Sequence, residues 1–490
     1  MDDSPTAILR VVLPRLPLIL KTALFNALSL SKNSSRQDVT TEVAVVVLRS
    51  VLQVRKPMRV LQKTTTRDPG IKGPILIAKV SVPISQEGDV LKDLLNRAIK
   101  ELGNGSETYT PPELTEVQAE WTGYKVGAAK NEPRPDLAEE DHYRILMGSV
   151  SSPTTILYFH GGAYFLLDPA SHRKTTSYLA KLTGGRCYSV RYRLAPQYPF
   201  PAQLLDALMS YLSLLSPPPG MPHEPVAAHN IVFAGDSAGG NLAIALLQLL
   251  LTLRRMGMTT ITFHGVEVPI HLPAGVAVNS PWVDIGRSMP SINNNAHFDY
   301  LDPPSAVGIS KAEPTPDDLW PTSPPRAEIF CNASMLVHPL TSPLSAAPEL
   351  WKGMPPVFMC LGNEGLEDEI TILARRMHQG GGTVSFMGYE GMPHCFAMVF
   401  PTAAMAKDCF QRWAKFCSDV SRGSGPSSSR AIWSEAFANP PKFRELEMDN
   451  ISKLTDSDVL DSMKERQNYG IEREQDAVKR WNEHRSRAKL

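Results

Sequence analysis

The sequence has no excess of charge of either sign. Its 490 residues carry 50 Lys and Arg against 50 Asp and Glu, so the formal net charge is zero. A chain that binds nucleic acid needs a basic surface to neutralise phosphates. We therefore expect no nucleic-acid partner. The length is sufficient for one large domain with additions, or for two or three smaller domains.

Cysteine is scarce and irregularly placed. No Cys-x-x-Cys pair and no zinc-type Cys/His spacing occurs among the six cysteines, which are Cys187, Cys331, Cys360, Cys395, Cys409 and Cys417. Disulfide frameworks and structural zinc sites both show characteristic spacings. The pattern predicts reduced, mostly buried thiols in an intracellular protein.

A long hydrophobic run is also lacking. A membrane span needs about 18 uninterrupted apolar residues, whereas segment 7–30 is broken by Arg10, Pro14, Arg15, Pro17 and Lys21. The first residues, 1–3, are acidic where a secretory signal is basic. We expect segment 7–30 to form a helix packed over an enzyme pocket. An amphipathic helix in peripheral contact with a bilayer is the alternative.

What the sequence does contain is an alternation of strand-like and helix-like segments. Short β-rich runs appear at 119–126, 142–147 and 154–159, and the alternation continues to about residue 418. Strands separated by helical crossovers predict a mostly parallel central sheet flanked by helices. We predict three parts. Residues 1–118 form a helical region that contributes a cap or lid, and residues 119–420 form the catalytic domain, with a Pro/Ser/Asn-rich insertion at 284–355. Residues 421–490 form a linker and a charged tail.

The motif Gly235-Asp236-Ser237-Ala238-Gly239 lies at the centre of this pattern. Gly-x-Ser-x-Gly alone is weak, because chance produces it in roughly one chain in six of this length. Here an apolar strand-like run precedes it and a long apolar helix-like segment follows. A serine on such a sharp turn stands clear of the sheet at a helix N-terminus. We predict that Ser237 is a nucleophile; a plain Gly-rich turn is the alternative.

A serine hydroxyl needs a base, and the base needs an orienting acid. His394 is the predicted base, because it lies in a turn between the strand-like run 383–389 and a helix. The acid is expected after the strand-like run 357–361. Glu364 is the first carboxylate on that loop and is the predicted acid, with Asp368 as the alternative. An acidic helix N-terminus would also explain these carboxylates.

The oxyanion of an acyl-transfer intermediate needs fixed N–H donors. The backbone N–H of Ala238, directly after the nucleophile, is one candidate. The loop His160-Gly161-Gly162-Ala163 follows the strand-like run 154–159, and its small residues let the backbone approach a substrate. We therefore predict an oxyanion hole from Gly161, Gly162, Ala163 and Ala238.

Several of these motifs occur together in a familiar order. They are His160-Gly161-Gly162-Ala163, Tyr192-Arg193-Leu194-Ala195-Pro196, Pro199-Phe200-Pro201-Ala202, Gly235-Asp236-Ser237-Ala238-Gly239-Gly240-Asn241 and the loops of Glu364 and His394. Residues 119–418 thus resemble the hormone-sensitive-lipase-type branch of the α/β-hydrolases. The resemblance implies the α/β-hydrolase fold, the triad Ser237, Glu364 and His394, and oxyanion donors at Gly162, Ala163 and Ala238.

This sequence departs from the family pattern at two positions. Ala163 replaces the third glycine of His-Gly-Gly-Gly, and the acid is Glu364 where Asp is commoner. The turn 391–396 is similar to fungal members of the branch, some of which act in secondary-metabolite or toxin pathways.

These residues together predict a serine carboxylic-ester hydrolase that forms an acyl-enzyme on a small to medium hydrophobic ester, without metal or organic cofactor. An acyltransferase or thioesterase with the same triad is the nearest alternative. A catalytically silent ligand-binding receptor of the same fold is an alternative of another class.

The chain ends in Ala488-Lys489-Leu490, a close variant of the Ser-Lys-Leu peroxisomal address. A basic flank precedes it. We expect a peroxisomal import receptor as partner and the peroxisome as location, with the cytoplasm as the alternative.

Overall fold

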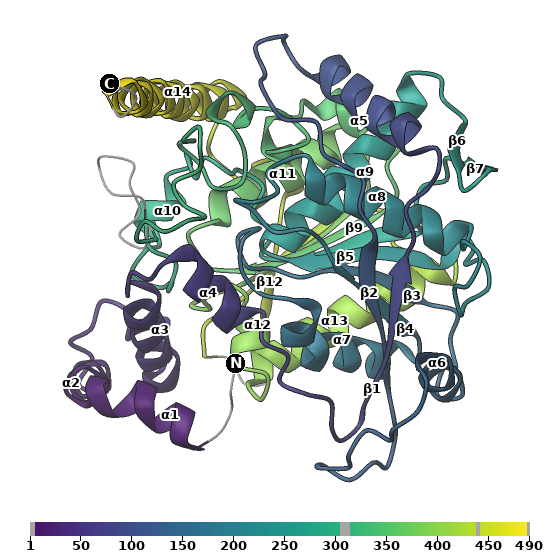
Figure 1. Ribbon diagram of the computed structural model, residues 1–490. Helices are drawn as coiled ribbons and strands as arrows, with labels where there is room; N and C mark the ends of the chain where they lie inside the picture. The colour runs from purple at the N-terminus through teal and green to yellow at the C-terminus, as the bar shows by residue number, and fades with distance from the viewer. Residues whose placement is uncertain (1–4, 304–313, 438–441, 488–490) are drawn as a thin grey trace.

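The core of the computed structural model is a twisted ten-stranded sheet (Figure 1). The structure describes residues 5–303, 314–437 and 442–487. The strand order is β1-β2-β4-β3-β5-β8-β9-β10-β11-β12. In chain order these strands are β1 (Ile75–Val82), β2 (Val117–Tyr124), β3 (Thr155–Phe159), β4 (Arg186–Arg191), β5 (Ile231–Asp236), β8 (Gly275–Asn279), β9 (Val357–Gly362), β10 (Val384–Tyr389), β11 (Arg430–Ser434) and β12 (Phe443–Leu446). A separate hairpin pairs β6 (Thr260–Phe263) with β7 (Val266–Pro269).

Most of the sheet is parallel, as predicted. The neighbours from β4 through β3, β5, β8, β9 and β10 to β11 pair in parallel. Antiparallel pairing is confined to the two edges, at β1–β2–β4 and at β11–β12. In the register, Asp236 faces Asn279, and Asn279 faces Cys360. The carboxyl ends of these central strands therefore meet at one edge of the sheet, where loops of an open α/β sheet bind ligands.

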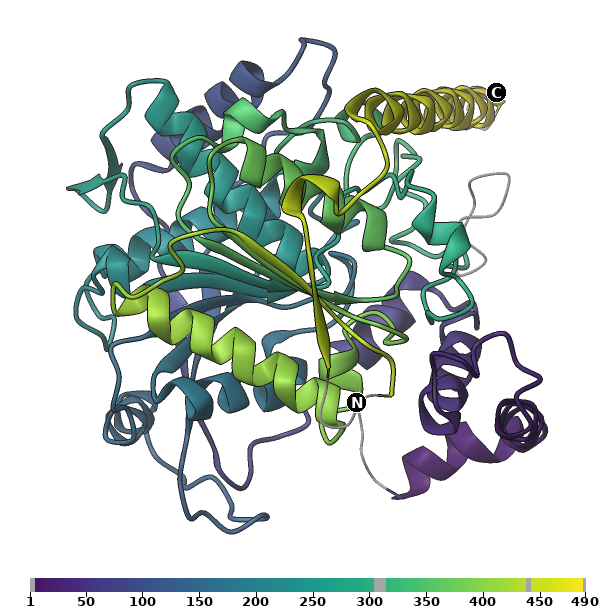
Figure 2. The same ribbon diagram turned by 180° about the vertical axis from the view of Figure 1, so that it is seen from behind.

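Helices cover both faces of the sheet (Figures 1 and 2). Helices α7 (Pro169–Thr183) and α13 (Ala404–Ser421) pack on one face. The other face carries α5 (Gly88–Leu102), α8 (Ala202–Leu215), α9 (Ala238–Arg255) and α11 (Glu367–Gln379). Strands that are buried on both faces need near-continuous apolar sequences, which β3 and β5 have.

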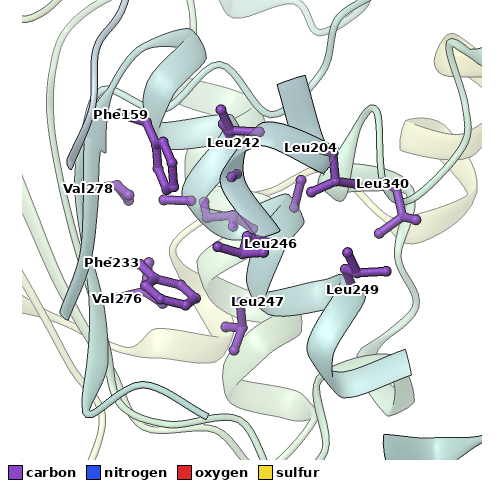
Figure 3. Close-up of a cluster of buried hydrophobic side chains, with 14 of the residues drawn as sticks. Phe159, Leu204, Phe233, Leu242, Leu246, Leu247, Leu249, Val276, Val278 and Leu340 are labelled. Carbon is purple, nitrogen blue, oxygen red and sulfur yellow. The ribbon is translucent and has the colours of Figure 1, made fainter. Parts of the chain in front are cut away.

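Helix α9 is deeply buried in the second layer. Its residues from Ala238 to Leu253 are all buried. Figure 3 shows leucines of this helix beside aromatic and valine side chains of the sheet; the labelled residues are Phe159, Leu204, Phe233, Leu242, Leu246, Leu247, Leu249, Val276, Val278 and Leu340. Truncating a buried leucine to alanine costs about 2–5 kcal/mol. This packing fixes the start of α9, where Ser237 lies.

The sheet extends beyond both predicted domain boundaries, at residues 118 and 420. Strand β1 and helix α5 fall within 1–118, and β1 pairs with β2 over its full length. Strands β11 and β12 fall within 421–490, and β11 pairs in parallel with β10. A strand added at the edge of a sheet forms its hydrogen bonds with a strand that is distant in the sequence. Such pairing leaves little trace in the local sequence pattern. The strands within residues 75–124 and 430–446 therefore belong to the central sheet.

One predicted strand is a helix. Residues 142–147, predicted as a β-rich run, form the end of α6 (Glu139–Met147). Three acidic side chains occupy the first turn of this helix, at Glu139, Glu140 and Asp141. Acidic residues in a first turn favour a helix through its dipole, and this signal outweighs the short apolar run.

The N-terminal helices lie at one corner of the molecule, beside the loops that follow β8 (Figures 1 and 2). They are α1 (Pro5–Val12), η1 (Leu13–Arg15), α2 (Leu16–Ala27), α3 (Val39–Leu52) and α4 (Met58–Thr65). Gln37, between α2 and α3, donates from Nε2 to the carbonyl oxygens of Phe298 and Gly391, at 2.8 Å each. The N-terminal region is thus tied to the loop that carries His394.

The predicted insertion 284–355 is mostly irregular. Its described part contains α10 (Ser291–Asn294), η3 (Ala333–Met335), η4 (Pro343–Ser345) and η5 (Pro348–Trp351). Short elements elsewhere are η2 (Ala228–Asn230), α12 (Phe396–Val399) and η6 (Met448–Asn450). The charged tail forms the helix α14 (Asp456–Arg487).

All six cysteines are buried and unpaired, as the sequence predicted. Among the described residues, no helix combines the length and the hydrophobicity needed to cross a bilayer. The predicted peroxisomal tripeptide, Ala488, Lys489 and Leu490, lies outside the described residues.

Candidate functional site

Ser237 lies on a sharp turn between β5 and α9. Its backbone has φ of +51° and ψ of −121°, a region that costs a non-glycine residue about 1–3 kcal/mol and is concentrated at functional sites. The turn is held by neighbours, since Ser237 N–H donates to the carbonyl of Asn279 at 3.1 Å and Ser237 C=O accepts from Trp282 N–H at 3.0 Å. The side chain is half-buried, so a substrate can reach it.

The glycines around Ser237 are required by close backbone approach. A Cβ at Gly235 would overlap the backbone of Gly239, and a Cβ at Gly239 would overlap the carbonyl oxygen of Phe159 in β3. The two glycines therefore let β5, β3 and α9 cross at van der Waals distance.

His394 and Glu364 form a buried pair at the same edge of the sheet. His394 follows β10, Glu364 follows β9, and the distance from His394 Nδ1 to Glu364 Oε1 is 2.8 Å. The carboxylate can only accept, so Nδ1 carries the proton. Nε2 is then the ring nitrogen left to exchange a proton with a reacting group.

Ser237 is related to the His394–Glu364 pair by the position of its strand in the sheet, not by a hydrogen bond. In the sheet, β8 separates β5 from β9, and β8 and β9 separate β5 from β10. All three residues therefore follow carboxyl ends of strands in the same parallel part of the sheet. Among the described residues, the structure has no hydrogen bond between the Ser237 hydroxyl and His394. Nε2 instead contacts Cys395 Sγ at 3.5 Å. Such catalytic hydrogen bonds often form only when substrate binds.

Asp368, the alternative acid, lies elsewhere. Its Oδ2 accepts from Ser291 N–H at 2.7 Å, and its own N–H donates to Ser291 Oγ at 3.0 Å. This reciprocal pair joins the first turn of α11 to α10. The geometry therefore favours Glu364 as the partner of His394.

Three of the four predicted oxyanion donors have the required freedom. In the described chain, no backbone or side-chain acceptor engages the N–H of Gly162 or Ala163, and Ala238 is the first residue of α9, where N–H groups lack intrahelical partners. Gly162 and Ala163 have φ of +104° and +53°. A Cβ at Gly162 would overlap the carbonyl oxygen of Leu166, so glycine is required there.

Gly161 is a correction to the prediction. Its N–H donates to Asp236 Oδ1 at 3.2 Å, so it is not available to an oxyanion. Asp236 also accepts from Tyr158 O–H at 2.7 Å and pairs with His172 at 3.2 Å. Asp236 therefore anchors the glycine loop to β5, a role that the motif alone did not reveal.

Comparison with known proteins agrees with this geometry. Residues 156–398 match the family described as alpha/beta hydrolase fold. An acetyl-hydrolase of Streptomyces hygroscopicus is 32% identical over 250 residues, which cover 50% of this chain and 69% of the relative. The chain belongs to the α/β-hydrolase fold family.

Other relatives of this α/β-hydrolase carry esterase names. An esterase of Acinetobacter venetianus is 28% identical over 266 residues, covering 53% of this chain and 74% of the relative. Versiconal hemiacetal acetate esterase of Emericella nidulans is 27% identical over 287 residues, covering 56% of this chain and 87% of the relative. The crystal structure of EstE5 soaked with p-nitrophenyl butyrate superposes with a TM-score of 0.51 at 22% identity, covering 77% of this chain and 99% of that chain, which shows the shared fold. The names agree with the predicted enzyme class, an esterase-type hydrolase.

Ser280 is a site residue of the hydrolase that the sequence did not reveal. It follows β8 with φ of +47°, and its hydroxyl donates to Glu364 Oε2 at 2.6 Å. The same hydroxyl accepts from Cys395 N–H at 3.1 Å. Gly362 N–H also donates to Glu364 Oε2, at 3.1 Å. Both oxygens of the wholly buried Glu364 are therefore engaged, and its orientation is fixed.

Asp299 is a second residue of this kind. Its carboxylate is fully buried and accepts from Gly365 N–H at 2.8 Å and from His394 N–H at 3.2 Å. It thus joins the loop of the acid to the loop of the base. Burial raises the pKa of Asp299. It lies in the irregular segment 284–355, where no periodic pattern marks a functional carboxylate.

The electrostatics of the site set the protonation state of His394. Burial acts to lower the pKa of His394, but contacts with Cys395 and Glu364 outweigh burial and hold that pKa well above its usual 6.5. Burial raises the pKa of the Cys395 thiol to about 11, so this thiol is neutral near pH 7. Glu364 is therefore the charge that favours the imidazolium. His394 must lose a proton before it can act as a base.

Proposed function

We propose that this α/β-hydrolase is a serine carboxylesterase that works through an acyl-enzyme. The observation that carries the proposal is the buried His394–Glu364 pair, 2.8 Å apart, at the edge of the sheet where Ser237 sits on its strained turn. An alcohol nucleophile needs this combination of base and orienting acid.

In the proposed reaction, Ser237 Oγ attacks the ester carbonyl while His394 Nε2 takes its proton. The Glu364 carboxylate holds Nδ1–H and stabilises the imidazolium. The N–H groups of Gly162 and Ala238 donate to the oxyanion, with Ala163 as a further donor. His394 then protonates the leaving alkoxide, and water repeats the sequence on the acyl-enzyme to release the acid.

A short acyl group is the proposed substrate feature. Two relatives are named for acetyl or acetate chemistry, which supports a small to medium hydrophobic ester. A place in a fungal secondary-metabolite pathway is also proposed, supported by the similarity of the turn 391–396 to fungal members of the branch. An enzyme in such a pathway would remove an acyl group that an earlier acyl transfer had added.

The test is turnover of p-nitrophenyl esters of increasing chain length, with a CoA thioester alongside. We expect the highest kcat/KM on short chains, free acid as the product, and a fall to background in the Ser237→Ala variant. A product in which an alcohol or amine carries the acyl group would make the enzyme a transferase. Preference for the CoA thioester would make it a thioesterase. No turnover of any ester would contradict the proposal.

We further propose import into peroxisomes through Ala488-Lys489-Leu490, supported by the similarity of this tripeptide to the Ser-Lys-Leu address. A fluorescent protein fused to the N-terminus should give puncta that coincide with a peroxisomal marker. Deleting the tripeptide should return the fusion to the cytosol. An unchanged distribution after deletion would contradict this location.

A further inference from the structure

The N-terminal helices expose an unusual amount of apolar surface. Nine of the twenty large apolar side chains exposed in the described residues lie between residues 9 and 30. Leu16, Leu20 and Leu24 of α2 and Leu28 at its C-cap repeat every four residues and are 41, 67, 57 and 58% exposed. Residues four apart share one helix face. Exposed apolar patches of this kind mark interaction surfaces.

The charged side chains of this stretch have one sign. Between residues 5 and 37 the sequence has cations, among them Arg10, Lys21 and Lys32, and no acidic residue; Asp2 and Asp3 precede this stretch and Asp38 follows it. Those three cations are exposed. Leucines beside exposed cations are the composition of a helix that lies in the headgroup region of an anionic bilayer.

The same charges disfavour a second copy of this chain as the partner that covers this surface. In a twofold interface the same patch meets itself, so Arg10, Lys21 and Lys32 would face like charges. An anionic lipid surface supplies the complementary charge and accepts the leucines without a matching protein groove. Helix α2 has 12 residues, far fewer than the roughly 20 needed to span a bilayer, so it would lie on the membrane.

The surface is coupled to the catalytic edge of the sheet. Just after α2, Asn33 Nδ2 donates to the carbonyl of His297 at 2.9 Å, and Gln37 Nε2 donates to the carbonyl of Gly391 at 2.8 Å. Gly391 lies three residues before His394. A membrane that binds α2 would therefore lie beside the loop of the base.

We propose that residues 9–30 form a docking surface for membranes with anionic lipids. The leucines of α2 enter the headgroup boundary, and the cations beside them contact lipid phosphates and carboxylates. This docking does not depend on the proposed esterase activity.

The experiment is flotation of the full chain with vesicles of phosphatidylcholine alone and with phosphatidylserine added. We expect flotation with the anionic vesicles and loss of at least about tenfold in bound fraction in 0.5 M salt, because surface charge is screened. The double variant Leu20→Glu/Leu24→Glu should lose binding. Lys21→Glu/Lys32→Glu should lose the preference for anionic vesicles.

The matched control is Val126→Glu, an apolar residue that is 85% exposed outside the proposed surface; it should float like the unmodified chain. Circular dichroism should give the same melting midpoint for all variants, since only exposed positions change. Failure of the unmodified chain to float would overturn the proposal. Equal loss of binding in the Val126 control would also overturn it. Dissociation of a dimer by the leucine variants, seen by light scattering without vesicle binding, would assign the surface to a second copy.

Discussion

Replacing Glu364 with glutamine perturbs the acid of the site while preserving its size. The glutamine oxygen can still accept from Ser280 and from Gly362 N–H, which hold Glu364 Oε2 at 2.6 and 3.1 Å. What changes is the partner of His394 Nδ1. An amide NH2 can donate to this nitrogen, and the proton then resides on Nε2. The imidazole would be in the wrong tautomer to accept a proton from Ser237.

The expected loss follows from the geometry. The carboxylate is wholly buried and 2.8 Å from Nδ1, so water does not replace it. Loss of the correct tautomer and of the charge that stabilises imidazolium should lower kcat by about 10³–10⁴, equivalent to about 4–5.5 kcal/mol of barrier. The pKa of His394 should fall as well, because Glu364 favours the charged ring.

The assay is steady-state hydrolysis of a short p-nitrophenyl ester, with Asp368→Asn as the matched control. Asp368 contacts Ser291 rather than His394, so its variant should keep kcat within about threefold. Thermal melting checks that both variants fold. A Glu364→Gln enzyme with near-normal kcat, or a larger loss in Asp368→Asn, would refute the reasoning.

Three further predictions concern the same site. The pH profile of kcat/KM should rise through the pKa of His394, with a midpoint well above 6.5, because the base must be neutral; a midpoint at or below 6.5 would contradict the electrostatics. The raised pKa of His394 should also stabilise the fold at low pH, and this stabilisation should be lost as the pH rises through that pKa. Gly162→Ala should lower kcat and melting temperature together, since its Cβ would overlap Leu166 O at φ +104°; normal turnover would remove this loop from the site. Ser280→Ala should destabilise the fold by about 1–3 kcal/mol and lower kcat roughly tenfold, because the buried Glu364 loses a donor; unchanged kcat and urea midpoint would show that Ser280 does not orient the acid.

The parts of the fold that the sequence predicted are those with local signatures. The parallel sheet follows from apolar runs separated by helix-length segments, and the turn at Ser237 follows from the spacing of Gly235 and Gly239. The structure explains that spacing through the overlap a Cβ would cause at either glycine. Short-range sterics of this kind are visible in sequence because they restrict residue type.

The parts that sequence missed depend on long-range contacts. Strand β11 pairs with β10 across a linker, and β12 pairs with β11. Such pairing leaves no requirement on residue type beyond β propensity. Asp299 and Ser280 act through hydrogen bonds to loops 66 and 84 residues away. Neither residue belongs to a motif. Gly161 was misassigned because the acceptor of its N–H, Asp236, is 75 residues distant.

The most direct test of the proposed mechanism is covalent labelling with a serine-reactive phosphonate, followed by peptide mass spectrometry. We expect one adduct on the peptide that contains Ser237, complete loss of labelling in Ser237→Ala, and slowed labelling in His394→Ala, because Ser237 then lacks its base. A protein that folds and yet is not labelled would be consistent with a ligand-binding receptor on the same fold. That result, or an adduct on another serine, would contradict Ser237 as the nucleophile.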